Sequence, residues 1–454
     1  MSPILAAWAG TLAAKGYSTA LLAMDGTALR TFAEIEAEAC SLQASLPAVA
    51  PGTVVAVQTG NDPIFPALLL ALWRAGCVPM PLDRSVEKDA LSAALAASGV
   101  GLHITREGIM AVAGGVWMDA DFLKLTSGTT GSPRVIRFRA AQLVADCVAV
   151  CDTMGLRGDD VNFGVIPWSH SYGFSNLLTP LLCRGIAVAL TDDRMPRAVL
   201  GGLARTGATV FPGLPVFFQK LAELDSAPLP RLRLCISAGA PLPRAVADAF
   251  RARYGVKIHS FYGSSECGGI AYDASEGDVP EGCVGEPLRG VTLSAEGESN
   301  RYSVRSAAVG EGYHPEPEPG VLGEGRFLPG DLLVRTAHGF VLAGRVSDFI
   351  NVAGRKLNPA EVETCLRQCP GVREAVVFGV PSALRGEEPI ACIVGDATPE
   401  QITHFAQAHL SRWQTPRAFW KVETLPVNER GKLSRRDLAT AWEGRDVAAT
   451  PRRS

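Results

Sequence analysis

One short segment of the chain is built almost entirely from hydroxyl residues and glycines. It comprises Thr126, Ser127, Gly128, Thr129, Thr130 and Gly131, and Ser132-Pro133-Arg134 follows it. Glycines let successive backbone N–H groups turn toward one anion, and Ser and Thr hydroxyls add further donors. The two glycines are three apart and no Gly-Lys follows them, which excludes the GxxxxGK[ST] phosphate loop. The segment predicts a polyphosphate cradle of another kind, although taken alone it would fit a flexible linker equally well.

A second group of residues places an aromatic ring, hydroxyls and a carboxylate directly after a predicted strand. It reads Phe261-Tyr262-Gly263-Ser264-Ser265-Glu266. An aromatic ring can stack on a nucleobase, and a carboxylate near phosphates makes sense mainly as a ligand of Mg²⁺. Further along, Gly330-Asp331, Gly344-Arg345 and Gly431-Lys432 add charged residues beside glycines. These segments together favour a nucleotide site over a linker.

The elements around these segments have the pattern of a parallel sheet. Leu232 to Ser237 predicts a strand, Pro243 to Arg253 a helix that begins with proline, and Val256 to Phe261 a second strand. This order implies a crossover connection, and ligands collect beyond the carboxyl ends of such strands. We therefore expect the loops after Ser237 and Phe261 to form part of the site.

The predicted fold class is α/β, with a large N-terminal domain over residues 1–345 and a smaller one over 346–454. Further strands are expected at 53–57, 185–190 and 209–211, and a helix at 63–73. Residues 273–329 are rich in Gly, Pro, Glu and Ser, which indicates a β-rich subdomain. In residues 346–454 helices and strands begin again, and that length suffices for an α+β domain with its own core.

Composition excludes several classes of protein. The chain carries 43 Lys and Arg against 46 Asp and Glu, so no excess of positive charge points to nucleic acid. The longest apolar run, residues 63–73, is far shorter than the roughly 20 residues of a transmembrane helix. Eleven cysteines without framework spacing, and no basic residue before the apolar N-terminus, favour a reducing cytoplasm. The seven histidines form no HExxH motif, so a zinc hydrolase is not supported.

In their order and spacing, the segments named above resemble the signature motifs of the adenylate-forming superfamily. This superfamily comprises acyl- and aryl-CoA synthetases, nonribosomal-peptide adenylation domains and firefly luciferase, and the resemblance runs from Leu123 to Leu438. It implies a large N-terminal part and a mobile C-terminal domain. It also implies ATP-dependent activation of a carboxylic acid to an acyl-adenylate with release of pyrophosphate, followed by transfer of the acyl group to a thiol.

The resemblance further implies a role for each site residue. Residues 126–131 and Arg134 would bind the β- and γ-phosphates, whereas Ser265, in the segment that also contains Gly263, would touch the α-phosphate. Glu266 would hold Mg²⁺, and Lys432 would be the catalytic lysine. Asp331 and Arg345 would bind the ribose or a phosphate. The adenine side would be formed by Ser237, Ala238, Gly239, Ala240 and Tyr262.

The acid site is expected at Pro167-Trp168-Ser169-His170-Ser171-Tyr172-Gly173, which resembles the family's P-x-x-H-x-x-G segment and makes His170 a pocket or gate residue. Relatives that activate amino acids carry Asp at the position of Ser171, so a fatty or aromatic acid is expected here. CoA is the expected thiol, and a separate acyl-carrier protein bearing phosphopantetheine is the alternative. Phe211, Phe217 and Phe218 fit either an acyl pocket or the core.

The chain departs from the family pattern at three points. Relatives usually carry Lys where this chain has Arg134, whose planar fork grips phosphate with less flexibility. Ser347 stands where many relatives have the hinge Asp, and the N-terminal region is reduced. Because of Arg134 and the short N-terminus, a nucleotide-binding paralogue without turnover remains an alternative.

Overall fold

The structure is a computed structural model that describes residues 2–86, 88–112, 114–127, 133–225, 229–297, 300–382, 385–426 and 434–449. The chain divides into two compact units. The larger one comprises Met1–Glu296, Tyr302–Pro329 and Arg335–Val341, and the smaller one comprises Gly297–Arg301, Gly330–Val334 and Leu342–Ser454. The domain boundary expected after residue 345 remains a prediction.

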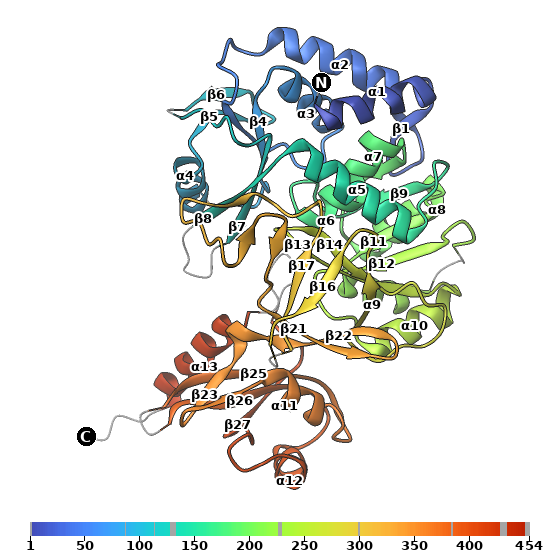
Figure 1. The fold of residues 1–454 in the computed structure, drawn as a ribbon. Coiled ribbons are helices and arrows are strands. Elements are labelled where there is room, and N and C mark those ends of the chain that lie inside the picture. The colour runs from blue at the N-terminus through green and yellow to red at the C-terminus, as the bar shows by residue number, and fades with distance from the viewer. Residues whose placement is uncertain are drawn as a thin grey trace. The chain divides into compact units, whose positions relative to one another are not determined.

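A sheet of eleven strands forms the centre of the larger unit (Figure 1), and residues 331–334 and 342–345 of its last two strands are assigned to the smaller unit. Its strands in spatial order are β2 (Ala28–Thr31), β1 (Thr19–Leu22), β10 (Ala187–Leu190), β9 (Val161–Gly164), β11 (Val210–Gly213), β12 (Leu234–Ser237), β13 (Ile258–Ser264), β14 (Gly268–Tyr272), β15 (Cys283–Pro287), β22 (Gly339–Arg345) and β21 (Asp331–Thr336). The run from β1 to β13 is parallel, and the pairs from β13 to β22 are antiparallel. The predicted α/β class is therefore confirmed.

Three smaller sheets complete the larger unit. The first has the order β4 (Val78–Pro81), β3 (Val54–Val57), β5 (Val100–Ile104) and β6 (Ile109–Ala111). The second is antiparallel and has the order β18 (Gly312–His314), β8 (Pro133–Phe138) and β7 (Phe122–Ser127). The third has the order β16 (Thr292–Ala295), β17 (Tyr302–Arg305), β20 (Arg326–Phe327) and β19 (Leu322–Gly323). It lies in the segment for which the turn-rich composition predicted a β-rich subdomain.

The helices of the larger unit pack on these sheets and on one another. They are α1 (Pro3–Lys15), α2 (Phe32–Ser45), α3 (Phe65–Arg74), α4 (Lys88–Ala97), α5 (Ala140–Met154), α6 (Ser171–Gly173), α7 (Thr179–Arg184), α8 (Pro196–Thr206), α9 (Pro215–Ala222) and α10 (Arg244–Tyr254), with a π-helix η1 (Phe174–Leu178) between α6 and α7. The first three contact one another and lie side by side, drawn in blue in Figure 1. No helix among the described residues is long and apolar enough to cross a bilayer.

The strand–helix–strand unit expected near the site is present. β12, α10 and β13 follow in that order, and β12 pairs with β13 in parallel, with Ser237 opposite Ser260. The prediction that the chain leaves the strand at Phe261 is wrong, because β13 continues to Ser264. The extension is stabilised by β14, which pairs antiparallel with this end of β13 and places Gly268 opposite Ser264.

The smaller unit has its own sheet and core. The sheet has the order β24 (Arg355–Leu357), β23 (Ile350–Val352), β26 (Gly386–Gly395) and β25 (Val372–Ser382), and β27 (Ala418–Val422) pairs with β26 in parallel. Helices α11 (Pro359–Leu366) and α13 (Arg435–Ala449) contact β25, and α12 (Pro399–His409) contacts α11. One apolar cluster includes Val362, Leu366, Val377 and Ile402, all of them buried. The expected α+β composition is therefore present in this unit.

Candidate active site

The Glu266 carboxylate is held from two sides in the larger unit. The Tyr313 hydroxyl donates a hydrogen bond to Glu266 Oε1 at 2.9 Å, and the Ser264 hydroxyl donates to Oε2. The backbone N–H of Gly310 also bonds the Glu266 carbonyl at 2.8 Å. Since an ionised carboxylate offers about four acceptor positions, these two hydroxyls leave some of them open.

A single oriented carboxylate fits the expected magnesium ligand. Mg²⁺ prefers oxygen ligands and is usually bound by one or two carboxylates together with substrate phosphates. No cluster of three or more His, Cys, Asp or Glu that could hold a metal occurs among the residues that the structure describes. One oriented carboxylate at Glu266 therefore suits a metal whose other ligands include the phosphates of a nucleotide.

Tyr313 also contacts Arg134, the residue at the departure from the family pattern. β18 pairs with β8, with Tyr313 opposite Ile136, so that the Arg134 guanidinium lies 3.9 Å from the centre of the Tyr313 ring. Arg134 Nη1 forms an ion pair with Glu318 Oε1 at 2.6 Å, and Nη2 donates to the Glu316 carbonyl at 3.3 Å. The guanidinium is thus bound by several partners, and phosphate would have to compete with Glu318 for it.

The hydroxyl-rich segment begins at the end of β7. Thr126 pairs with Arg134 across the ladder, and its hydroxyl donates to the Arg134 carbonyl at 3.4 Å. The predicted phosphate-binding residues Gly128, Thr129, Thr130 and Gly131 lie outside the described residues, as does the side chain of Ser127. Their role remains a prediction.

The expected adenine side lies at the carboxyl ends of β12 and β13. The Ser237 hydroxyl oxygen, in the last residue of β12, is buried and lacks a hydrogen-bond partner among the described residues. Ala238 is buried and Ala240 is exposed, and Gly239 between them has a φ of +84°, a left-handed conformation that favours glycine. On β13, Tyr262 is buried and Gly263 is exposed. The structure thus brings both predicted segments to neighbouring strand ends, as expected for a parallel sheet.

The expected acid segment contacts the expected α-phosphate segment. The Ser171 hydroxyl, at the start of α6, donates a hydrogen bond to the Ser265 hydroxyl oxygen at 2.8 Å. Tyr172 anchors this helix, because its hydroxyl donates to the Ile236 carbonyl at 2.8 Å. His170 Nδ1 accepts a hydrogen bond from the Tyr172 N–H at 3.3 Å. Phe211 and Phe218 are fully buried and their rings pack edge to face, so these side chains form part of the core.

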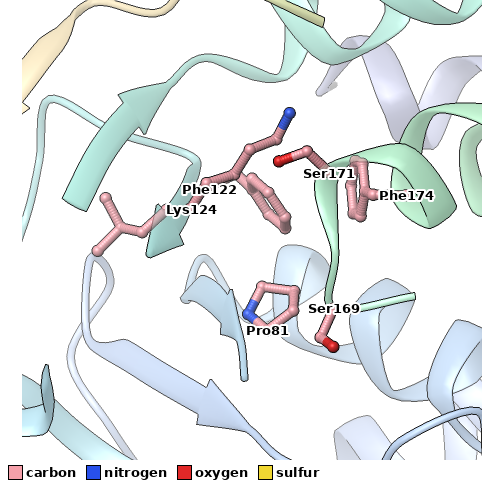
Figure 2. A pocket seen from close by; sticks show the side chains of 7 residues that line it. Pro81, Phe122, Lys124, Ser169, Ser171 and Phe174 are labelled. Atoms are coloured by element: carbon pink, nitrogen blue, oxygen red, sulfur yellow. The ribbon is translucent and has the colours of Figure 1, made fainter. Parts of the chain in front are cut away.

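Beside Ser171 the structure has a small hollow. It is lined by Pro81, Phe122, Leu123, Lys124, Ser169, Ser171 and Phe174 (Figure 2). Phe122, Lys124 and Thr126 alternate along β7 and therefore lie on one face of this strand. A buried lysine thus shares a strand face with the first hydroxyl of the predicted phosphate segment.

Tyr313 and Lys124 are the residues that sequence reasoning missed. The Tyr313 contact depends on the pairing of β18 with β8, between segments separated by more than 170 residues, and no local pattern reports such a pairing. Lys124 had a usable signal, because period-two alternation before Thr126 already assigns both residues to one face.

The remaining predicted residues belong to the smaller unit. Arg345 Nε and Asp331 Oδ1 form an ion pair at 2.6 Å, so the structure brings these two predicted ribose residues together. Lys432 lies outside the described residues. Arg435, three residues after it, forms ion pairs with Asp348 at 2.6 Å and Glu363 at 2.7 Å.

Comparison with known proteins identifies relatives along the chain. The family model of the AMP-binding enzyme matches residues 11–119 and 116–313, and the model of the AMP-binding enzyme C-terminal domain matches 361–432. Feruloyl-CoA synthase of Amycolatopsis is 29% identical over 457 residues, which cover 90% of this chain and 93% of that protein. Benzoate–CoA ligase of Thauera aromatica is 29% identical over 348 residues, which cover 71% and 66%. The crystal structure of ATP-bound MatB from Rhodopseudomonas palustris has the same fold, with a TM-score of 0.84 and 24% sequence identity. The match covers 96% of this chain and 98% of that one.

Proposed function

Because the chain belongs to the AMP-binding enzyme family, we propose that it joins a fatty or aromatic carboxylic acid to the thiol of CoA. The chain is an AMP-forming acid–thiol ligase. In the first step a carboxylate oxygen bonds to the α-phosphorus of ATP while the bond to the pyrophosphate oxygen breaks. In the second, the sulfur of a thiolate bonds to the acyl carbon and AMP leaves.

One hydrogen bond supports the proposed location of the first step in the larger unit. The hydrogen bond of 2.8 Å between Ser171 and Ser265 joins the segment assigned to the acid and the segment assigned to the α-phosphate. The acid carboxylate and the α-phosphate must meet within bonding reach for adenylation to occur. The contact supports a site in which the acid binds at the Ser171 side and the nucleotide at the Ser265 side.

Charge is the main difficulty of the first step, since an anionic carboxylate must approach a polyanion. We assign Glu266 as the ligand of Mg²⁺, which would neutralise phosphate charge when bound. Tyr313 and Ser264 orient the Glu266 carboxylate through the hydrogen bonds described above. Lys432 would add positive charge at the α-phosphate, and Asp331 with Arg345 would bind the ribose.

The acid and the thiol are proposed from the lack of charge at Ser171 and from the names of relatives. Ser171 is uncharged, so an α-ammonium group would find no counter-charge at this position. The names of the two CoA ligases similar to this chain, for ferulate and benzoate, favour an aromatic acid. CoA is the proposed acceptor, a separate carrier protein is the alternative, and the cytoplasm is the proposed location.

The test measures pyrophosphate release from ATP and Mg²⁺ with a panel of aromatic and fatty acids. Acid-dependent release is expected, and mass spectrometry should then find an acyl-CoA when CoA is added. A pantetheinylated carrier protein in place of CoA separates the two acceptors. If none of the acids in the panel causes the release of pyrophosphate, the ligase assignment is contradicted. That result would favour a nucleotide-binding paralogue without turnover.

A further inference from the structure

Lys124 is a buried lysine with no hydrogen-bond acceptor for its ammonium among the described residues. It lies on β7 and is only 7% exposed. Its Nζ lies 4.6 Å from the centre of the Phe138 ring and 5.6 Å from that of Phe174, so aromatic faces supply part of its surroundings. Lysines are almost never fully buried unless they are paired, because removing an ammonium from water is costly. The position therefore requires an explanation beyond packing.

The charged groups that face Lys124 are already engaged elsewhere. Asp146 accepts hydrogen bonds from the Ser175 hydroxyl and from the Gly269 N–H, and Glu266 accepts from Ser264 and Tyr313. Burial lowers the pKa of the Lys124 ammonium, and the Asp146 and Glu266 carboxylates oppose this shift. These carboxylates act on the lysine at a distance and leave its N–H donors without an acceptor.

The Lys124 side chain lines the hollow beside the proposed acid site. Figure 2 shows the Lys124 side chain, from β7, and the Ser171 side chain, from α6, next to one another at the edge of this hollow. Another lining residue, Ser169, has a buried hydroxyl oxygen without a hydrogen-bond partner among the described residues. The cavity volume is about 10 Å³, which is roughly the space that one water molecule needs. The hollow therefore suits one polar group of a ligand rather than a long acyl chain.

We propose that Lys124 is a specificity-determining residue, and that it selects acids whose acyl part carries a second oxygen acceptor. This inference rests on the proposed function, since it places the acid beside Ser171. A second carboxylate or a ring oxygen would accept hydrogen bonds from the Lys124 ammonium, which has no acceptor among the described residues. An acid without this oxygen would leave the ammonium unpaired in a water-poor site, and enzymes reject such analogues strongly.

The test compares acids in matched pairs by pyrophosphate release. Benzoate is compared with the three hydroxybenzoates and the three benzenedicarboxylates, and butyrate with succinate. The wild type should favour at least one oxygen-bearing acid over its unsubstituted partner by about 10- to 100-fold in kcat/KM, the range of a hydrogen bond to a charged group. Whether the hydroxylated or the dicarboxylic member is favoured distinguishes the two kinds of oxygen.

Lys124→Met, which keeps the length of the side chain without its charge, should abolish this preference and leave kcat/KM for the unsubstituted acid unchanged or higher. Lys220→Met is the matched control, because Lys220 is exposed on α9 and pairs with Glu223. Wild-type preference for unsubstituted acids would overturn the inference. An equal loss for every acid in Lys124→Met would do the same, because Lys124 would then bind the reacting carboxylate.

A binding measurement separates this inference from the ligase assignment. Without ATP, the favoured acid should raise the melting temperature of the wild type and not that of Lys124→Met, whereas a shift that is equal in both proteins speaks against the lysine. If no acid releases pyrophosphate from the wild type, the proposed function fails regardless of these shifts. Should Lys124→Met not fold, Lys124→Gln takes its place. The acid preference of the wild type remains a test without any variant, because a preference for unsubstituted acids overturns the inference.

Discussion

The substitution Tyr313→Phe tests whether the Glu266 carboxylate is positioned for the first half-reaction. It removes the hydroxyl that donates to Glu266 Oε1 at 2.9 Å and keeps the ring 3.9 Å from the Arg134 guanidinium. Burial raises the pKa of Tyr313, so the hydroxyl remains a donor at any ordinary assay pH. The variant thus deletes one hydrogen bond and keeps the aromatic contact.

The expected magnitude follows from the partners of Glu266. A hydrogen bond to a charged group contributes about 1.5–3 kcal/mol, and the lower end applies because Ser264 still bonds the other oxygen. Since about 1.4 kcal/mol corresponds to a factor of ten, adenylation should slow roughly tenfold. Pyrophosphate release measured over a range of Mg²⁺ concentrations should show a higher Mg²⁺ requirement.

Two further variants make the result specific. Tyr313→Leu also removes the ring, so it should additionally raise the KM for ATP through the loss of the Arg134 contact. Tyr302→Phe is the matched control, because Tyr302 lies on β17 and packs against Phe340 instead. A Tyr313→Phe enzyme with the wild-type rate and the wild-type Mg²⁺ titration would refute the proposed positioning of Glu266.

Four other predictions concern single residues. Glu266→Gln should weaken the Mg²⁺ dependence and depress adenylation, and an unchanged Mg²⁺ titration would remove Glu266 from the site. Arg134→Ala should raise the KM for ATP and not that for the acid, whereas equal changes in both would exclude a phosphate clamp. Lys432→Ala should slow pyrophosphate formation by about 10²–10³-fold and leave thioester formation from synthetic acyl-adenylate intact. An equal loss in both half-reactions would contradict this role of Lys432. Partial burial raises the pKa of Asp160, but its hydrogen bond with Arg233 outweighs this and lowers the pKa below the ordinary value. The stabilisation by Asp160 should be fully present above about pH 3.9 and be lost as the pH falls through the lowered value. Urea unfolding of Asp160→Asn at pH 7 and pH 3 should show a smaller loss on acidification than the wild type, and equal losses would contradict this.

Local patterns were sufficient for the elements that carry the site. β12 and α10 begin within two residues of their predicted starts, because an apolar run and a proline at a helix start are signals within one segment. The antiparallel extension of β13 was not predicted, since it depends on β14 pairing back onto it. The sequence alone predicts a strand's existence better than its end, because the neighbouring strand decides where the ladder stops.

The site residues likewise divide into those that a local motif predicts and those that depend on contacts between distant segments. Glu266, Ser265 and Ser171 were predicted from their motifs, yet only the structure shows that Ser171 and Ser265 are bonded to each other. Tyr313 and the Glu318 partner of Arg134 come from a part of the chain where no motif had been recognised. Motifs report the groups that a ligand touches, whereas the residues that orient those groups depend on long-range packing.

Charge in the larger unit explains why adenylation needs cations beyond those described there. The Glu266 carboxylate directly follows Ser265 in the chain, and the positive charge of Arg134 is paired with Glu318. Two like charges 4 Å apart repel by about 4 kcal/mol at an effective dielectric constant near 20, and both acid and ATP bring negative charge. Mg²⁺ and Lys432, in their proposed roles, supply the positive charge that offsets this repulsion. After adenylation the acyl group is no longer a carboxylate, and this repulsion between acid and phosphate is gone. Variants of Glu266 and Lys432 should therefore impair the first half-reaction far more than thioester formation from a supplied adenylate.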